Sequence, residues 1–224
     1  MAQSMLMCGF GVPAIVVALA GAQPVSESIG GSMVRFHASA EARENALPSM
    51  ALVEARPATG EAPGGFPVDV EFGRDGDRWT ASVALEDGTS LYGTGEVAGP
   101  LMRNGRVVET WNTDAYGYQE DTAGVYTSHP WVLAVRKDGT AFGVLADTTY
   151  RCEIDLKDGI VFRAVGPEQP VIVIDGRSPQ EVCERLGELT GTITMPPKWA
   201  IGYHQCRYSY DPADRVRELC RMRD

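Results

Sequence analysis

Residues 131–145 have the sequence WVLAVRKDGTAFGVL, in which two apolar runs flank Lys137-Asp138-Gly139. An Asp-Gly pair between two apolar runs is a strong signal for a β-hairpin, because aspartate and glycine tolerate the positive φ angles of the tightest turns. The pattern recurs where Lys157-Asp158-Gly159 separates residues 152–156 from residues 160–162. Two hairpins so close together predict an antiparallel sheet.

Three further stretches extend this pattern on both sides. Residues 79–85, WTASVAL, alternate apolar and polar positions, as a half-buried strand does. Asn104-Gly105 lies between Leu101-Met102 and Val107-Val108 and predicts a third hairpin. The continuous apolar run at residues 171–174, VIVI, predicts a strand that is buried on both faces. We therefore expect a mainly β fold, an antiparallel β-sandwich.

The period changes after residue 177. Ser178-Pro179-Gln180-Glu181 is a capping box with proline at the first helical position, and Gly191 ends the predicted helix. Met195-Pro196-Pro197-Lys198 follows as a stiff linker. Beyond it, residues 199–204 predict a strand and Asp211-Pro212 begins a second helix.

A single strand and helix cannot bury their apolar faces alone, so the last segment is typical of the first unit of a larger domain. We expect four parts. They are a leader or poorly defined strand (1–30), a β-sandwich domain (31–177), a connecting helix and linker (178–195) and the start of a further, truncated domain (196–224).

Composition narrows the classes of function. The chain has 224 residues, 44% of them hydrophobic, and a formal net charge of −10. Because it has no basic stripe, neither a nucleic-acid partner nor an anionic membrane surface is expected. Five widely spaced cysteines and three histidines favour neither a disulfide framework nor a zinc site. We expect no metal, no cofactor and a reducing, cytoplasmic location.

The amino terminus leaves a second location open. Residues 6–22 are mostly apolar and end in small residues, as the core of a signal peptide does. However, no lysine or arginine precedes this run, and Gly9, Gly11 and Pro13 interrupt it. The alternatives are an exported protein with a signal peptide, or a cytoplasmic protein in which the run is a first strand or a leader.

Three motifs carry a resemblance to a known family. Residues 91–96 (LYGTGE), 111–118 (WNTDAYGY) and 196–210 (PPKWAIGYHQCRYSY) resemble, in the same order, segments of family 31 glycoside hydrolases. The resemblance covers residues 91–224. It implies a galactose-mutarotase-like β-sandwich followed by a (β/α)8 barrel, of which residues 196–224 would be the first βα unit.

The resemblance also implies an activity. Family members related to α-glucosidase hydrolyse terminal α-linked glucose from oligosaccharides with retention, and they use two aspartates further along the barrel. Such a barrel takes about 250 residues. We therefore expect a truncated chain with no catalytic residue, which is inactive by itself, and an intact enzyme that acts on an oligosaccharide. Whether the intact enzyme is a monomer or a homo-oligomer is left open.

Three residues are candidates for substrate binding by the same resemblance. Asp114 and Tyr116 would lie on a loop over the mouth of the active site, and Tyr208 would follow the first barrel strand at its carboxyl end. Two of them have a specific structural alternative. Asp114 could bond its own backbone in a turn, and Tyr208 could plug the end of the barrel.

Two other classes of function are compatible with a β-sandwich. One is a non-catalytic carbohydrate-binding module, and the other is an interaction domain whose sugar site has decayed. Residues 199–224 argue against the first, because a binding module has no use for the start of a barrel. Within the family, α-xylosidase and transferase activities are the alternatives to α-glucosidase.

Overall fold

The computed structural model describes residues 17–18, 23–47, 57–204 and 211–221. The chain divides into two compact units, Met1–Gly191 and Thr192–Asp224. Each is described by itself below.

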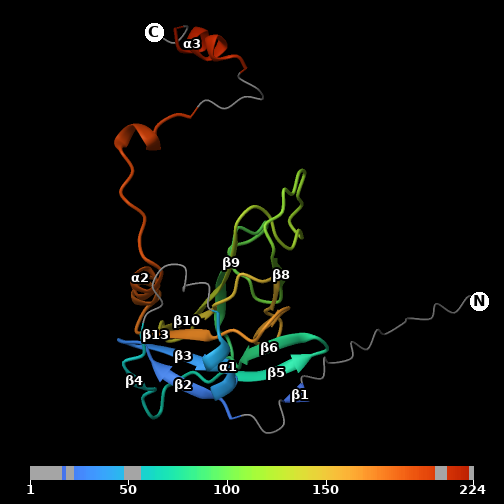
Figure 1. Cartoon of the computed structure of the whole chain (residues 1–224), viewed down its shortest axis with the longest axis vertical. Helices are drawn as coiled ribbons and strands as arrows, with labels where there is room; N and C mark the ends of the chain where they lie inside the picture. Colours follow the sequence, from blue (N-terminus) through green and yellow to red (C-terminus); the bar gives the residue numbers. More distant parts are fainter. Residues whose placement is uncertain (1–16, 19–22, 48–56, 205–210, 222–224) are drawn as a thin grey trace, which may run out of the picture. The chain divides into compact units, whose positions relative to one another are not determined.

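The first unit contains two antiparallel sheets (Figure 1). The six-stranded sheet has the order β1 (Val17–Ala18), β5 (Glu71–Asp75), β6 (Arg78–Val83), β12 (Ile160–Ala164), β11 (Cys152–Asp155) and β8 (Val107–Thr110). The seven-stranded sheet has the order β4 (Gly60–Glu61), β2 (Val25–Ser28), β3 (Met33–His37), β13 (Val171–Gly176), β10 (Ala141–Ala146), β9 (Ser128–Val135) and β7 (Ser90–Gly95). A short helix, α1 (Ala40–Asn45), follows β3. The mainly β, antiparallel fold expected from the sequence is confirmed.

The main core contains the facing side chains of the two sheets. Trp79 and Phe162 come from the six-stranded sheet and are fully buried, and Phe142 and Val144 come from the seven-stranded sheet. The expected alternation of residues 79–83 is confirmed, because Trp79, Ala81 and Val83 all join this core.

A second apolar layer covers the outer face of the seven-stranded sheet. Helix α2 (Pro179–Thr190) packs Val182 against Ile172 and Ile174 of β13. Because one face of β13 meets the main core and the other meets α2, all four residues of the run at 171–174 are buried, as predicted. The predicted cap is also present: the Ser178 hydroxyl accepts from the Glu181 N–H at 3.3 Å.

Two of the three expected hairpins are confirmed. Strands β9 and β10 pair across Asp138-Gly139, and β11 and β12 pair across Asp158-Gly159. The prediction of a third hairpin, at Asn104-Gly105, is wrong, because Leu101 and Met102 are exposed and form no strand.

The Asn104 side chain has a different role. It accepts from the Leu91 N–H at 2.8 Å and donates to the Thr89 carbonyl at 2.8 Å. A side-chain amide offers the same donor and acceptor as a peptide group. Asn104 therefore pairs with the beginning of β7 in place of a neighbouring strand.

Residues 1–30, expected to be a leader or a poorly defined strand, contain two short strands that pair with the sheets. Within residues 1–30, β2 pairs with β3, and the two residues of β1 pair with β5. Residues 1–16 and 19–22 lie outside the described residues. None of the described helices is long and apolar enough to span a membrane.

The second unit contains the 3-10 helix η2 (Lys198–Ile201) and the helix α3 (Ala213–Arg221). The helix expected after Asp211-Pro212 is confirmed, but the strand expected at residues 199–204 is wrong. A strand needs a neighbour to satisfy its backbone groups, and no described strand pairs with this segment. Trp199 is 80% exposed and Ile201 72%.

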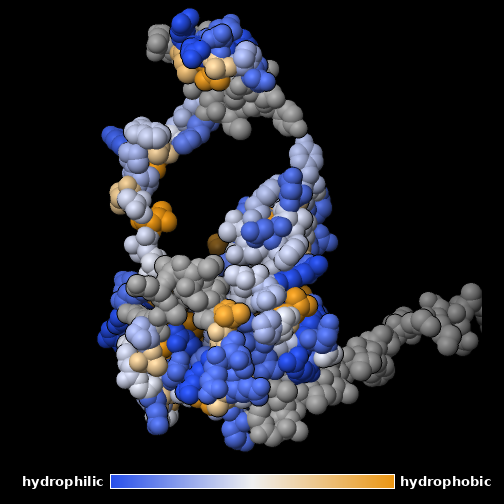
Figure 2. All heavy atoms as spheres, viewed as in Figure 1, coloured by the Kyte–Doolittle hydropathy of each residue, from blue (hydrophilic) through white to orange (hydrophobic). Residues whose placement is uncertain are grey.

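The two units differ in how many large apolar side chains they expose to solvent. The visible face of the sandwich is mostly hydrophilic in Figure 2. In the second unit, large exposed apolar side chains follow one another closely along the chain: Ile193, Met195, Trp199, Ile201 and Tyr203.

Candidate functional site

Asp114 lies on the loop of residues 111–127, between β8 and β9, here called the Asp114 loop. Backbone and side-chain bonds pair the two limbs of this loop at its base. The Thr113 N–H donates to the Val125 carbonyl at 2.8 Å. The Asn112 carbonyl oxygen Oδ1 accepts from the Ser128 N–H at 2.8 Å. Asp114 follows directly where this pairing ends.

The Asp114 carboxylate is exposed, and no described residue forms a hydrogen bond or ion pair with it. The bonds that hold the local turn do not involve this carboxylate. The Ala115 N–H donates to the Thr113 carbonyl at 2.9 Å, and the Tyr116 N–H donates to the Asp114 carbonyl at 3.1 Å. The side chain does not support the turn, so it is free to accept hydrogen bonds from a ligand.

The other two predicted residues are placed differently. Tyr116 lies two residues after Asp114 on the same loop. Its side chain is 99% exposed, so it does not pack on the sandwich. Tyr208 lies outside the described residues. The structure therefore brings Asp114 and Tyr116 to one loop and does not test Tyr208.

Two arginines brace the Asp114 loop and its neighbour. Arg106 donates to the Ala98 carbonyl at 2.9 Å and to the Glu120 carbonyl at 2.6 Å, which joins the loop after β7 to the Asp114 loop. Gly99 allows this approach, because a Cβ there would lie 2.9 Å from the Glu120 carbonyl and would overlap the Arg106 guanidinium.

Arg103 is buried and binds three backbone carbonyls. It donates to Gly93 at 3.4 Å, Pro100 at 2.5 Å and Val97 at 3.3 Å. Burial lowers its pKa, and the charge of Arg106 lowers it further. The sequence does not reveal the role of either arginine. Each binds backbone carbonyls, which every residue has, so no acidic partner in the sequence marks the contact.

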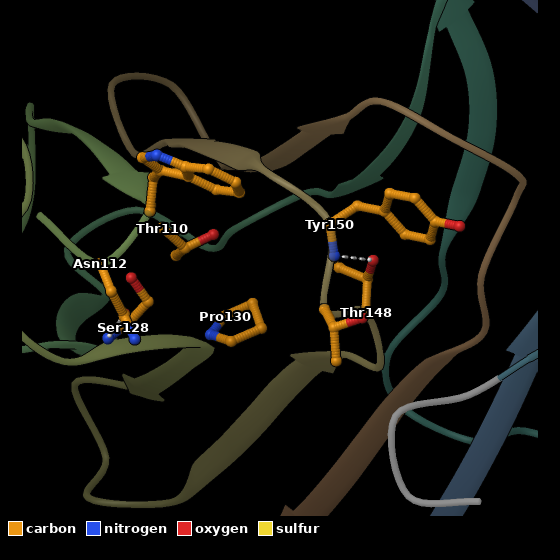
Figure 3. A pocket seen from close by; sticks show the side chains of 8 residues that line it. Thr110, Asn112, Ser128, Pro130, Thr148 and Tyr150 are labelled. Carbon is orange, nitrogen blue, oxygen red and sulfur yellow. Dashed lines mark hydrogen bonds between the residues drawn. The ribbon is translucent and has the colours of Figure 1, made fainter.

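A hollow of about 340 Å³ lies at the base of the Asp114 loop (Figure 3). Three segments line it, namely the end of β8 with the residues after it, the beginning of β9, and the turn after β10. The lining residues are Thr110, Trp111, Asn112, Ser128, Pro130, Thr148, Thr149 and Tyr150. None of these side chains carries a formal charge.

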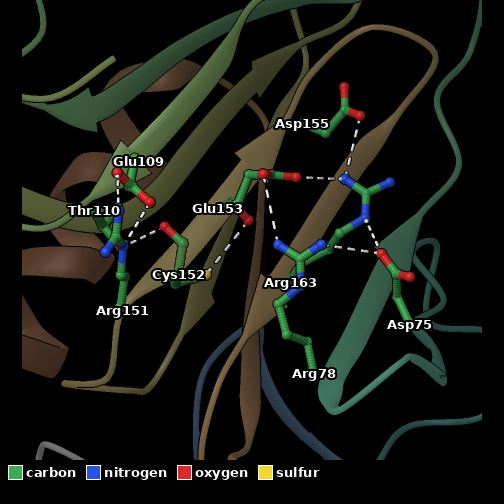
Figure 4. A network of polar contacts seen from close by, with 9 residues as sticks. All are labelled: Asp75, Arg78, Glu109, Thr110, Arg151, Cys152, Glu153, Asp155 and Arg163. Atoms are coloured by element: carbon green, nitrogen blue, oxygen red, sulfur yellow. Dashed lines mark hydrogen bonds and ion pairs between the residues drawn. The ribbon is translucent and has the colours of Figure 1, made fainter.

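Acidic side chains on the six-stranded sheet are paired with arginine (Figure 4). Arg163 lies 3.1 Å from Glu153, 3.2 Å from Asp155 and 3.4 Å from Asp75. Arg78 also contacts Asp75, at 3.2 Å. Carboxylates held by guanidinium groups stabilise the sheet and are poor candidates for acid–base chemistry.

Nucleophilic and metal-binding groups are scarce in the described part of the chain. Burial raises the pKa of the Cys152 thiol to about 12, so it is a poor nucleophile. Among the described residues, no cluster of histidine, cysteine, aspartate and glutamate could hold a metal ion. What the arrangement offers is hydrogen-bond acceptors and aromatic surface for a polar, uncharged ligand.

Two family models match the chain. Residues 68–155 match the Glycosyl hydrolase 31 N-terminal galactose mutarotase-like domain. Residues 193–224 match the Glycosyl hydrolases family 31 TIM-barrel domain. The first range covers most of the six-stranded sheet and the Asp114 loop, and the second covers the unit that contains η2 and α3.

Several curated proteins are similar in sequence. Alpha-glucosidase 2 of Bacillus thermoamyloliquefaciens is 39% identical over 139 residues, which are 60% of this chain and 18% of that protein. An α-xylosidase of Lactiplantibacillus pentosus is 32% identical over 116 residues, which are 50% of this chain and 14% of that protein. The chain thus spans a small part of the length of these relatives.

Solved structures agree with this fold. A family 31 α-glucosidase from Bacteroides thetaiotaomicron is 45% identical, with a TM-score of 0.52, over 64% of this chain and 25% of that one. A family 31 dextranase from Flavobacterium johnsoniae, complexed with isomaltotriose, has a TM-score of 0.72 over 91% of this chain and 30% of that one. At 21% identity the second likeness shows the fold alone.

Proposed function

The chain belongs to glycoside hydrolase family 31, and we propose that the whole protein is a retaining α-glucosidase that releases terminal α-linked glucose from oligosaccharides. Two relatives named α-glucosidase, at 39% and 45% identity, support this choice over α-xylosidase, for which the similar protein is 32% identical.

We propose that the two catalytic carboxylates lie in the barrel outside these 224 residues. A retaining glycosidase holds its nucleophile and its acid/base about 5–5.5 Å apart on a rigid frame. In the described residues, the clustered carboxylates of the six-stranded sheet are bound to Arg78 and Arg163 instead. The chain by itself should therefore not cleave a glycoside.

The contribution of this chain is then the Asp114 loop. The exposed, unpaired carboxylate of Asp114, on a loop braced by Arg106 and Asn112, is the observation that carries this role. A carboxylate accepts strong hydrogen bonds from neutral hydroxyl groups, and adjacent sugar hydroxyls can fill both of its oxygens. Tyr116 would add an aromatic surface on the same loop, and Tyr208 would contact the sugar from the barrel side.

The direct test compares three substrates. The intact protein should cleave maltose and an aryl α-glucoside with higher kcat/KM than the matching aryl α-xyloside, while the 224-residue chain should release no sugar from any of them. A preference for the xyloside would favour the α-xylosidase alternative. Turnover by the chain alone, surviving repurification, would show that the catalytic groups lie within these residues.

A further inference from the structure

The hollow at the base of the Asp114 loop has a composition that the role of Asp114 does not explain. Asp114 is not among its lining residues. Two aromatic side chains line it, Trp111 and Tyr150, and the larger, Trp111, is 52% exposed although tryptophan is usually well buried. The Arg151 guanidinium lies 5.9 Å from the centre of the indole. Arg151 is held in turn by Glu109, at 2.6 and 2.7 Å, so the indole is braced and still half open to solvent.

Unused polar groups surround this platform. The Asn112 amide uses its oxygen to accept from the Ser128 backbone, which leaves its NH2 group as a donor. The Thr148 hydroxyl accepts from the Tyr150 N–H at 3.1 Å and keeps its own proton to donate. No described residue bonds the hydroxyls of Ser128 and Thr149. The hollow therefore offers several donors and acceptors without a charge.

Pro130 adds an apolar surface between these groups. Figure 3 shows its ring between Ser128 on one side and Thr148 on the other. The hollow has a volume of about 340 Å³, and ligand pockets usually have volumes of roughly 300–1,000 Å³. It is large enough for one sugar ring and too small for a long oligosaccharide to enter whole.

We propose that this hollow is a sugar-binding site of the sandwich itself, which holds one pyranose unit of a neutral oligosaccharide against Trp111. A pyranose ring has an apolar C–H face and a rim of hydroxyls. The indole and Pro130 match the face, and the groups of Asn112, Ser128 and Thr148 match the rim. The uncharged lining disfavours phosphate and carboxylate ligands, which seek arginine, lysine or a helix N-terminus.

This site shares with the proposed function only the class of ligand. Its binding is measured without turnover, on the 224-residue chain. A failure of sugar binding here and a failure of α-glucosidase activity in the intact protein are therefore separate results.

Titration of the chain with maltose and isomaltose tests the proposal, with tryptophan fluorescence and saturation-transfer NMR as the readouts of binding. Of the four tryptophans, Trp79 and Trp131 are buried, so a fluorescence change reports on Trp111 or Trp199. We expect saturable binding in the millimolar range, since one shallow ring contact makes few bonds. Trp111→Ala should weaken it at least tenfold, and Trp111→Phe should retain part of the affinity.

Two further variants keep the result decisive. Ser128→Ala removes one hydroxyl but leaves the backbone bond to Asn112 in place, and it should weaken binding several-fold even if Trp111→Ala fails to fold. Trp199→Ala is the matched control, because Trp199 is exposed outside the hollow, and it should bind as the unaltered chain does. Absence of saturable binding would overturn the proposal. So would Trp111→Ala and Ser128→Ala variants that bind with the same affinity as the unaltered chain.

Discussion

The indole of Trp131 on β9 lies directly over Gly143 on the neighbouring strand β10, so that a Cβ at residue 143 would overlap the ring. Trp131 is 5% exposed and belongs to the layer between the seven-stranded sheet and α2. A glycine in the middle of a strand usually weakens it, and here it provides the space for the largest side chain of that layer.

We predict that Gly143→Ala lowers the free energy of unfolding by about 1–3 kcal/mol, the usual cost of overpacking a core. The indole must move away from β10 to make room for the added methyl group. Urea unfolding measures the loss. Gly64→Ala is the matched control, because a Cβ there meets nothing within 4 Å, and its midpoint should stay unchanged. Equal stability of the two variants would mean that the Trp131 ring has room to shift.

Arg163 supplies a second stability prediction. Its side chain is 9% exposed and contacts three carboxylates that are 21–35% exposed. Arg163→Met leaves these carboxylates close together without their main counter-charge. Breaking a fully buried pair costs about 3–5 kcal/mol, and partial exposure of the partners should reduce this to about 1–3 kcal/mol.

The loss of stability in Arg163→Met is best compared with the loss in Arg151→Met. The Glu109–Arg151 pair is bidentate but exposed, at 38% and 54%. Exposed pairs contribute about 0–1 kcal/mol. Thermal unfolding of both variants should therefore rank Arg163→Met as clearly the less stable. The reverse ranking would contradict a structural role for the Arg163 cluster.

Acid should destabilise the sandwich through the buried His37 and the half-buried His129. Burial lowers the pKa of His37, although the hydrogen bond and charge of Glu27 oppose the shift, and burial also lowers the pKa of His129. Arg35 and Arg43 lower the pKa of His37 further. An unfolded histidine titrates near 6.5. Just below that pH the unfolded state binds more protons than the folded state, so stability present above about pH 6.5 is lost as the pH falls towards the folded pKa values.

Urea unfolding between pH 8 and pH 6 measures this effect, since ordinary carboxyl groups titrate well below that range. Each histidine can contribute a slope of up to about 1.4 kcal/mol per pH unit. Replacement of both His37 and His129 by glutamine should flatten the curve. A flat curve in the unaltered chain would show that neither imidazole is protected from protonation.

Local patterns predicted much of this fold, and long-range contacts explain where prediction failed. Asp138-Gly139 predicted its hairpin because a tight turn depends on adjacent residues. Asn104-Gly105 carries the same signal, but the Asn104 side chain bonds Leu91 and Thr89, which the local sequence does not reveal. Trp199 and Ile201 fit a strand pattern, but the described residues provide no neighbouring strand.

The candidate site was predictable to a similar degree. The resemblance of residues 111–118 placed Asp114 on a loop, and the structure shows its carboxylate exposed on one. The hollow beside Trp111 could not be predicted, because Asn112, Ser128 and Thr148 come from three segments that meet only after the sheets form. The role of Tyr208 stays a prediction.

Asp114→Ala in the intact protein should reduce kcat/KM on maltose by about tenfold to a hundredfold. The loss of a charged hydrogen bond to a hydroxyl, roughly 1.5–3 kcal/mol, accounts for this range. An aryl α-glucoside has fewer leaving-group hydroxyls and should lose less. The melting temperature should not change, because the carboxylate makes no bond to the described residues.

Asp121→Ala is the control for Asp114, since Asp121 is a second exposed carboxylate on the same loop. It should leave both substrates unaffected. Equal losses of activity on maltose and on the aryl glucoside, with a lower melting temperature, would assign Asp114 to the support of the loop rather than to substrate.

Proton NMR of maltose hydrolysis by the intact protein tests the central claim most directly, because it reports the bond cleaved and the stereochemistry together. A retaining α-glucosidase releases the new glucose as the α-anomer, which then equilibrates to the β-anomer. We predict that the α-anomer signal rises first. No glucose release, or a β-anomer signal that rises first, would contradict the account of this chain as part of a retaining α-glucosidase.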